Sequence, residues 1–150
     1  MDERRRYARG LRTRRRVLGD EHVEEALRRR TALTADFQDL ITRYAWGEIW
    51  TRRGLPRTTR SLVTLAALVA LGRSEELRMH LRAALRNGVG RDQVKEVLLQ
   101  MAVYCGVPAA NSAFQRAAEV FAEVDAGGRA RPRPRTARRR RRKRPSKRAR

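Results

Sequence analysis

The sequence is poor in the residues that build disulfide, redox and metal sites. Its 150 residues include a single cysteine, Cys105, and two histidines, His22 and His80. One cysteine excludes an intramolecular disulfide, which favours a reducing and therefore cytoplasmic location. Neither C-x-x-C nor H-E-x-x-H occurs, and no glycine-rich phosphate loop follows a strand pattern. We therefore expect no metal centre and no bound cofactor.

Long apolar runs and strand patterns are also missing. The longest apolar run, residues 62–71, is interrupted by Thr64 and is far too short to span a bilayer. No signal-peptide pattern opens the chain, and no strand-like alternation is bounded by hairpin turns. Helical periodicity dominates instead, which predicts an all-α domain of about six helices, the first of them with Asp20 as its N-cap. Several of these helices have broad apolar faces, so we expect a homo-oligomer.

The end of the chain lacks acidic residues. The formal net charge is +21, of which residues 129–150 contribute +14 and the first sixteen residues +6. Residues 17–128 carry only +1, so the body of the protein is nearly neutral. We expect a helical domain over residues 1–128, followed by a disordered, Arg-rich basic tail over residues 129–150.

The composition of the tail is typical of non-specific polyanion binding. Its positive charge would release counterions from nucleic acid or another polyanion, with steep salt dependence. Aromatic residues, which stack on bases in proteins that bind single strands, are absent from it. A selected nucleic-acid-binding role and a solvated tail with incidental anion binding both stay open at this point.

Two acids and a histidine fall together in "GRSEELRMH", residues 72–80. On a helix that starts near Ser74, Glu76 and His80 are four residues apart and share a face. A carboxylate beside an imidazole favours the protonated imidazole, so this pair predicts a general acid that works near neutral pH. The alternative is structural, because acids in a first helical turn stabilise the helix dipole in any protein.

Aromatic residues make up only 5% of the chain, yet three of them fall within "RYAWGEIW", residues 43–50. The segment belongs to a helix predicted to start at Thr34 and to continue to Trp50, whose spacing places Trp46 and Trp50 on one face, and Tyr44 and Glu48 on another. The segment is typical either of core and interface packing or of a pocket wall that carries polar groups.

Longer stretches of the sequence resemble a known family. The segments "ITRYAWGEIW", "HLRAALRNGV" and "AVYCGVPAAN" closely resemble the 4-carboxymuconolactone decarboxylases of aromatic-acid degradation, and the similarity covers roughly residues 7–124. The resemblance implies an all-helical, alkylhydroperoxidase D-like fold, a homo-oligomer similar to hexamers, and a small lactone as substrate. The basic tail lies outside the resemblance.

Peroxidases of the same superfamily use a C-x-x-C-x-x-x-H motif for thiol redox chemistry. When the histidine of that motif is matched to His80, the two cysteine positions fall on Arg73 and Glu76. Cys105 belongs to a different predicted helix. The resemblance therefore implies a decarboxylase without dithiol chemistry, and the alternatives are a thiol-dependent hydroperoxidase-like enzyme and a nucleic-acid-binding protein.

The reaction implied by the resemblance is the cofactor-free conversion of 4-carboxymuconolactone to 3-oxoadipate enol-lactone and CO2 in the protocatechuate (3-oxoadipate) pathway. The enzyme must supply a donor to the lactone oxygen, a proton for the ring α-carbon and a cation for the second carboxylate. His80 is expected as the acid or as the donor, with Glu76 orienting it. Tyr44 and Glu48 are candidates for the other proton transfer.

The remaining candidates would bind the substrate. Trp46 is expected in the pocket wall. Arg43 or Arg73 would bind the second carboxylate, because a fork-shaped guanidinium matches its two oxygens. His22, in a segment that also resembles the family, is either a further substrate-binding residue or an exposed helix histidine.

Overall fold

The computed structural model describes residues 2–130 and is helical throughout this part of the chain. In chain order the elements are α1 (Glu3–Leu18), α2 (Asp20–Arg28), α3 (Ala35–Ile41), the π-helix η1 (Thr42–Trp46), the 3-10 helix η2 (Ile49–Thr51), α4 (Arg57–Ala70), α5 (Ser74–Arg86), α6 (Arg91–Cys105) and α7 (Val107–Ala130). The all-α class predicted from the sequence is confirmed. Within residues 2–130, no helix is both long and apolar enough to cross a membrane.

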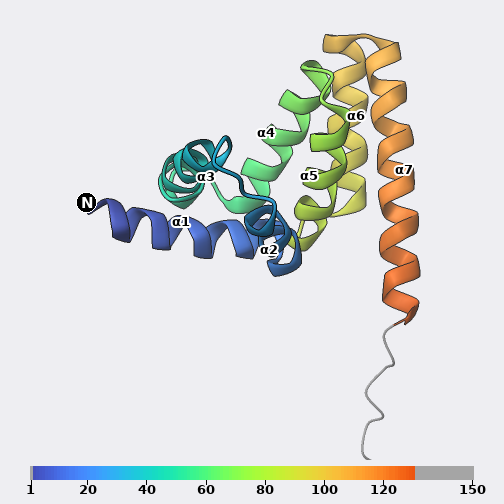
Figure 1. The fold of residues 1–150 in the computed structure, drawn as a ribbon. Helices are drawn as coiled ribbons and strands as arrows, with labels where there is room; N and C mark the ends of the chain where they lie inside the picture. The colour runs from blue at the N-terminus through green and yellow to red at the C-terminus, as the bar shows by residue number, and fades with distance from the viewer. Residues whose placement is uncertain (1, 131–150) are drawn as a thin grey trace, which may run out of the picture.

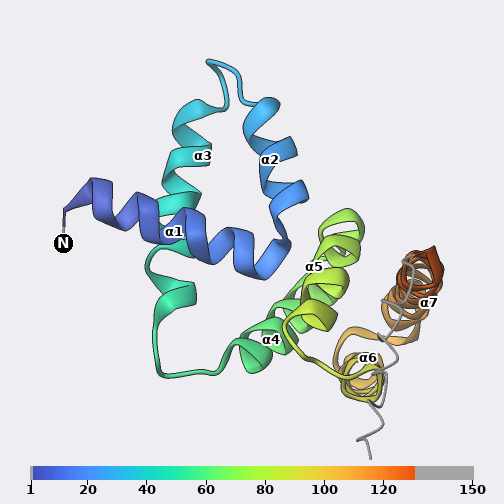
Figure 2. The same ribbon diagram turned by 90° about the horizontal axis from the view of Figure 1, so that it is seen from below.

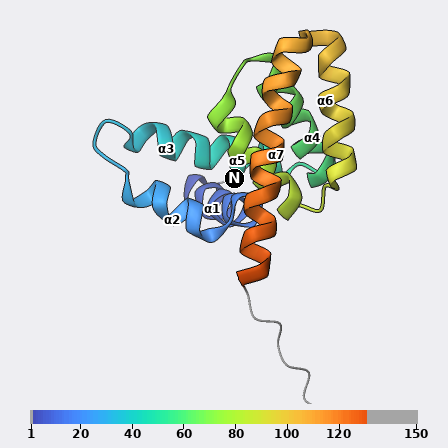
Figure 3. The ribbon, with the colours of Figure 1, turned by 90° about the vertical axis from the view of Figure 1, so that its right-hand side faces the viewer.

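The helices form two groups that meet at α5. In Figure 1, α4, α5, α6 and α7 stand side by side as a bundle, and α6 and α7 run in opposite directions. Helix α1 lies across one end of this bundle, and α2 and α3 extend from it, joined by a loop (Figure 2). Figure 3 shows the group of α1, α2 and α3 on one side of the bundle. Because α5 packs against α1, α4 and α7, it connects the two groups.

Two apolar clusters form the core, and α5 contributes side chains to both. The larger cluster lies within the bundle and includes the fully buried side chains Leu65, Leu81, Val94, Leu98 and Val120. The smaller cluster joins α1, α2, η1 and α5 through Val17, Leu18, Val23, Trp46 and Ala83. Residues along α5 therefore lie at the junction of the two groups.

Two glycines let α1 approach the π-helix η1 closely. A Cβ atom at Gly10 would overlap the carbonyl oxygen of Thr42 and lie 2.9 Å from its carbonyl carbon. A Cβ atom at Gly47 would lie 2.5 Å from the carbonyl oxygen of Arg6. Neither position accepts a side chain without a backbone shift, so these glycines determine how closely α1 approaches the aromatic segment.

The π-helix interrupts the single helix that the sequence predicts around Thr34 to Trp50. The Gly47 N–H donates to the Thr42 carbonyl at 2.9 Å, five residues earlier, and the helix ends there. A π turn contains more residues than an α turn, so the faces expected from a period of 3.6 do not continue. The prediction of one continuous helix is therefore wrong beyond Ile41.

The prediction of about six helices omitted α1. The buried positions of this helix are Gly10, Arg14, Val17 and Leu18, and the many arginines around them hide the apolar period. At the other end, α7 continues through Gly127 and Gly128 to Ala130, two residues beyond the domain end expected at residue 128. Residues 131–150 of the expected tail lie outside the described residues, so its disorder stays a prediction.

Candidate active site

His80 is a partly buried, neutral histidine on α5. Its pKa is lowered to about 4, chiefly by burial and to a smaller extent by the neighbouring His22, whereas Glu76 one turn earlier raises it by a smaller amount. The expectation that Glu76 keeps His80 protonated near neutral pH is therefore wrong. At neutral pH the ring offers one N–H donor and one acceptor nitrogen.

His22 is exposed on α2, as one of the two sequence interpretations expected, and it lines a groove between α2 and α5. The groove has a volume of about 760 Å³, and Leu18, Met79 and Arg82 contribute to its wall. Partial loss of solvent around the ring, followed by the positive charges of Arg14 and Arg82, lowers the pKa of His22 below its usual value. Because His22 also lowers the pKa of His80, the structure brings the two histidines into electrostatic contact from different helices.

Trp46 provides an apolar wall next to α5. It is 7% exposed and stacks on Trp50, with ring centres 5.2 Å apart and an interplanar angle of 30°. In the smaller cluster it packs together with Ala83 and Met79, which lie close to His80 in the sequence of α5. The helix breaks after Trp46, yet the two indoles that the sequence placed together remain stacked.

Tyr44 and Glu48 meet at Arg6 of α1. The guanidinium carbon of Arg6 lies 5.2 Å from the centre of the Tyr44 ring, a cation–π distance. The Nε atom of the same arginine lies 3.4 Å from Glu48 Oε2. The structure therefore brings Tyr44 and Glu48 to one place, where both remain partly exposed and share a cation that the sequence did not predict.

The two arginines proposed for the second carboxylate lie apart. Arg43 faces α1, with its Nε atom 3.8 Å from Glu3 Oε2 and its Nη2 atom 4.0 Å from Asp39 Oδ2. Arg73 is exposed and lies seven residues before His80, which is about 10 Å along a helix axis. It lines a different pocket, of about 280 Å³, between α4, α5 and α7. Neither arginine is a free cation beside His80.

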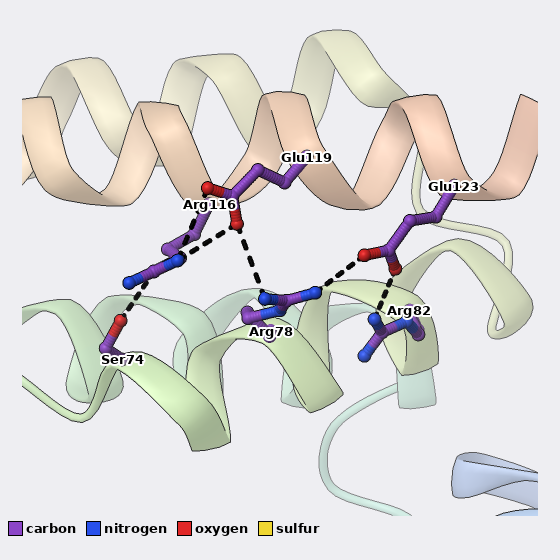
Figure 4. A network of polar contacts seen from close by, with 6 residues as sticks. All are labelled: Ser74, Arg78, Arg82, Arg116, Glu119 and Glu123. Carbon is purple, nitrogen blue, oxygen red and sulfur yellow. Dashed lines mark hydrogen bonds and ion pairs between the residues drawn. The ribbon is translucent and has the colours of Figure 1, made fainter.

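Ion pairs hold α5, and with it His80, against α7. Figure 4 shows the network of Ser74, Arg78, Arg82, Arg116, Glu119 and Glu123. A guanidinium nitrogen of Arg78 lies 2.6 Å from Glu123 Oε1, and Arg116 Nε donates to Ser74 Oγ at 2.8 Å. These contacts occupy the side of α5 that faces α7.

The chain's single thiol lies on another helix. Cys105 ends α6, and its Sγ atom lies 3.9 Å from Met101 Sδ on the same helix. Arg73 and Glu76, at the cysteine positions of the dithiol motif, are both exposed. In residues 2–130, His, Cys, Asp and Glu side chains form no group of three that could hold a metal ion.

Comparison with known proteins decides the family. A profile described as the carboxymuconolactone decarboxylase family matches residues 35–119. A 4-carboxymuconolactone decarboxylase from Acinetobacter baylyi is 52% identical over 124 residues, which make up 83% of this chain and 92% of that protein. The chain belongs to the carboxymuconolactone decarboxylase family.

Two further relatives of this family member are also named as decarboxylases. A nitrosuccinic acid decarboxylase from Metarhizium robertsii is 46% identical over 105 residues, 70% of this chain and 73% of that protein. A 4-carboxymuconolactone decarboxylase from Pseudomonas putida is 46% identical over 48 residues, 32% of this chain and 100% of that sequence. The carboxymuconolactone decarboxylase profile includes Glu48 and His80, whereas His22 precedes it.

In this carboxymuconolactone decarboxylase family member, the sequence patterns did not identify two arginines of α1 as candidate site residues. Arg6 contacts Tyr44 and Glu48, and Arg14 is 4% exposed, one helical turn before the groove residue Leu18. A helix over residues 3–18 would have placed Arg14 and Leu18 on one face, because they are four apart. The spacing of Arg14 and Leu18 could have indicated this face, but the many arginines of the segment leave no clear apolar periodicity.

Proposed function

We propose that this protein is a cofactor-independent carboxy-lyase that converts 4-carboxymuconolactone to 3-oxoadipate enol-lactone and CO2. The observation that carries the proposal is the 52% identity over 92% of a 4-carboxymuconolactone decarboxylase. The neutral His80, the adjoining His22 and the Trp46 wall support it, because they offer a donor and an apolar boundary in one region.

The substrate carries its own electron sink. Its ring γ-carbon bears the leaving carboxylate and a CH2COO⁻ arm. When the bond to the carboxylate breaks, its electron pair forms a new ring double bond, and the original double bond shifts toward the lactone carbonyl. Negative charge then develops on the lactone oxygen, and one proton on the α-carbon restores the carbonyl and completes the enol-lactone.

His80 acts best as the donor to the developing oxyanion. Its low pKa leaves it neutral at working pH, so it holds no extra proton to deliver as an imidazolium. A neutral imidazole N–H can still stabilise an enolate-like oxygen, and such a donor is worth more in a partly buried site than in water. Glu76, one turn earlier on α5, orients the ring.

The proton for the α-carbon comes from the η1–η2 segment. Tyr44 and Glu48 are the two candidates there, and Arg6 holds both of them at the edge of α1. A donor on this segment would approach the ring from a different element than His80, so the two roles do not compete for one side chain. Trp46 forms the wall that limits access of water.

A shared substrate skeleton supports the same chemistry. Nitrosuccinic acid, named in one relative, and 4-carboxymuconolactone both contain a succinate unit, in which a CH2 group links a carboxylate-bearing carbon to a second carboxylate. In both molecules that carbon is also connected to an electron sink, the nitro group or the unsaturated lactone. A site that binds the second carboxylate and places a hydrogen-bond donor beside the electron sink would suit both substrates.

The proposal extends to assembly, location and the tail. Large exposed apolar side chains such as Val103 and Tyr104 suit a homo-oligomer. A chain with one free cysteine suits the reducing cytoplasm. Non-specific polyanion binding remains the proposed property of residues 129–150.

The test is a spectrophotometric assay of the full chain on freshly prepared 4-carboxymuconolactone, without added metal or thiol. We expect loss of the lactone absorbance together with CO2 release, and an at least hundredfold lower kcat for His80→Ala, in the usual range of about 10²–10⁴ for losing such a group. Cys105→Ser is the matched control and should keep wild-type turnover. A folded wild-type protein that does not consume the lactone would refute the proposal.

A further inference from the structure

Helix α1 buries an arginine that has no acidic partner. Arg14 is 4% exposed, and it is the one charged residue among the buried side chains of residues 2–128. Its Nη1 atom donates to Gln38 Oε1 at 2.9 Å and reaches Thr42 Oγ1 at 3.4 Å, and both of these acceptors are neutral. A buried guanidinium without a carboxylate is costly, because its charge is removed from water without compensation.

The unused atoms of Arg14 form one edge of its guanidinium. Its Nε atom is buried and has no hydrogen-bond partner, and the two hydrogen bonds of this side chain both come from Nη1. Nε and Nη2 are the pair of donors that bind both oxygens of a carboxylate side by side. The protein therefore fixes one end of this guanidinium and leaves its carboxylate-binding edge unpaired.

Other arginines near the candidate site already have acidic partners. Arg6 pairs with Glu48, and Arg43 lies near Glu3 and Asp39. Arg14 differs from them because burial, and not an acid, dominates its environment and lowers its pKa. The contrast indicates that the anion for Arg14 comes from outside the protein.

Arg14 also lies on the correct side of α1. Leu18, four residues later on the same face, lines the groove that contains His22. The positive charge of Arg14 lowers the pKa of His22, and His22 in turn lowers that of His80. The guanidinium of Arg14 therefore lies within electrostatic reach of His22.

We propose that Arg14 binds the carboxylate that the substrate keeps, the CH2COO⁻ group of its succinate unit, through Nε and Nη2. The inference rests on the proposed function. It replaces Arg43 and Arg73 in that role, since the first is paired with acids and the second lines another pocket. With the retained carboxylate on Arg14, the electron sink would face the two histidines.

The test compares Arg14→Gln with Arg16→Gln in the full chain. Arg16 is an exposed arginine two residues further along α1, so its replacement removes the same charge without touching Arg14. We expect Arg14→Gln to raise KM about tenfold or more, the usual effect of losing a charge-assisted hydrogen bond, and to change kcat less. Arg16→Gln should keep the wild-type KM.

A second readout does not depend on turnover. Succinate binds the native state but cannot react, so it should raise the Tm of the wild-type protein and of Arg16→Gln by about 3 °C or more at saturating concentration. Chloride at equal ionic strength is the control anion and should have little effect, because it cannot accept from Nε and Nη2 through two oxygens. In Arg14→Gln the shift caused by succinate should disappear.

The outcomes separate the inference from the proposed function. A wild-type KM together with a wild-type succinate shift in Arg14→Gln overturns the role of Arg14 and leaves the lyase proposal intact. A wild-type protein that ignores the lactone, yet is stabilised by succinate through Arg14, refutes the lyase proposal and keeps the anion site. If Arg14→Gln does not fold, Arg14→Lys takes its place. Lysine keeps the buried charge but lacks the paired N–H donors of the guanidinium. An unchanged KM in Arg14→Lys overturns the inference.

Discussion

At the scale of single residues, burial outweighs charge in setting the chemistry of His80. Glu76 is placed one turn away, as the sequence predicts, and it does favour the imidazolium. Partial burial of the His80 ring among the helices packed around α5 nevertheless outweighs this effect, and the pKa of His80 is lowered to about 4. The pattern of residues thus predicted the pair correctly but not its protonation state, because burial depends on helices that are distant in the sequence.

The lowered pKa of His80 makes folding stability depend on pH. The unfolded chain takes up this proton near pH 6.5 and the folded protein only near pH 4, so the unfolded state binds more protons in between. Stability therefore falls as the pH drops through this window, by up to about 3 kcal/mol below pH 4. Urea unfolding at pH 7, 5.5 and 4.5 measures the effect.

His80→Gln is the comparison that isolates this contribution, since other titrating groups remain in both proteins. The variant should lose less stability than the wild type between pH 6.5 and 4. Equal losses in the two proteins would show that His80 titrates at its ordinary pKa in the folded state.

At the scale of elements, the approach of α1 to η1 positions Tyr44 and Glu48. Gly10→Ala should destabilise the protein by about 1–3 kcal/mol, because its Cβ would overlap the Thr42 carbonyl group. The sign is informative, since alanine in a helix otherwise stabilises it by up to about 1 kcal/mol over glycine. Urea unfolding measures the change.

Gly127 provides the matched control for this prediction. It also lies inside a helix, but a Cβ there would meet nothing within 4 Å. Gly127→Ala should therefore be neutral or slightly stabilising. If Gly10→Ala behaved in the same way, the close contact between α1 and η1 would not hold in solution.

The elements differ in how far the sequence predicts them. Helices α4 to α7 were predictable because Gly72, the Asn87–Gly88 pair and Gly106 mark their ends, and apolar residues recur at helical spacing between them. Helix α1 was not, because its buried face includes Arg14 and Gly10. The π-helix was not predictable either, since its hydrogen-bond register forms against the backbone of α1.

At the scale of the whole molecule, large apolar side chains remain exposed where α6 passes into α7. Val103, Tyr104 and Val107 are 81%, 77% and 71% exposed. A patch of this kind is typical of a subunit interface. We expect it to bury itself against a second copy of the chain.

Val103→Glu tests this expectation by placing a charge in the patch. The variant should shift from the oligomer to a smaller species in size-exclusion chromatography with light scattering, because burying an unpaired carboxylate is unfavourable. Ala8→Glu adds the same charge to an exposed position on α1 and should leave the mass unchanged. An unaltered mass for Val103→Glu would place the interface elsewhere.

The π turn at Thr42–Trp46 also makes the length of this segment a functional variable. Deleting one residue would let the chain continue as an ordinary α-helix, and every following residue would rotate by about 100° and move by about 1.5 Å. Gly47 would then leave its contact with α1, and Glu48 would leave Arg6. The extra residue is a spacer that sets where the side chains after it point, so an insertion or deletion here would move Glu48 without replacing any side chain.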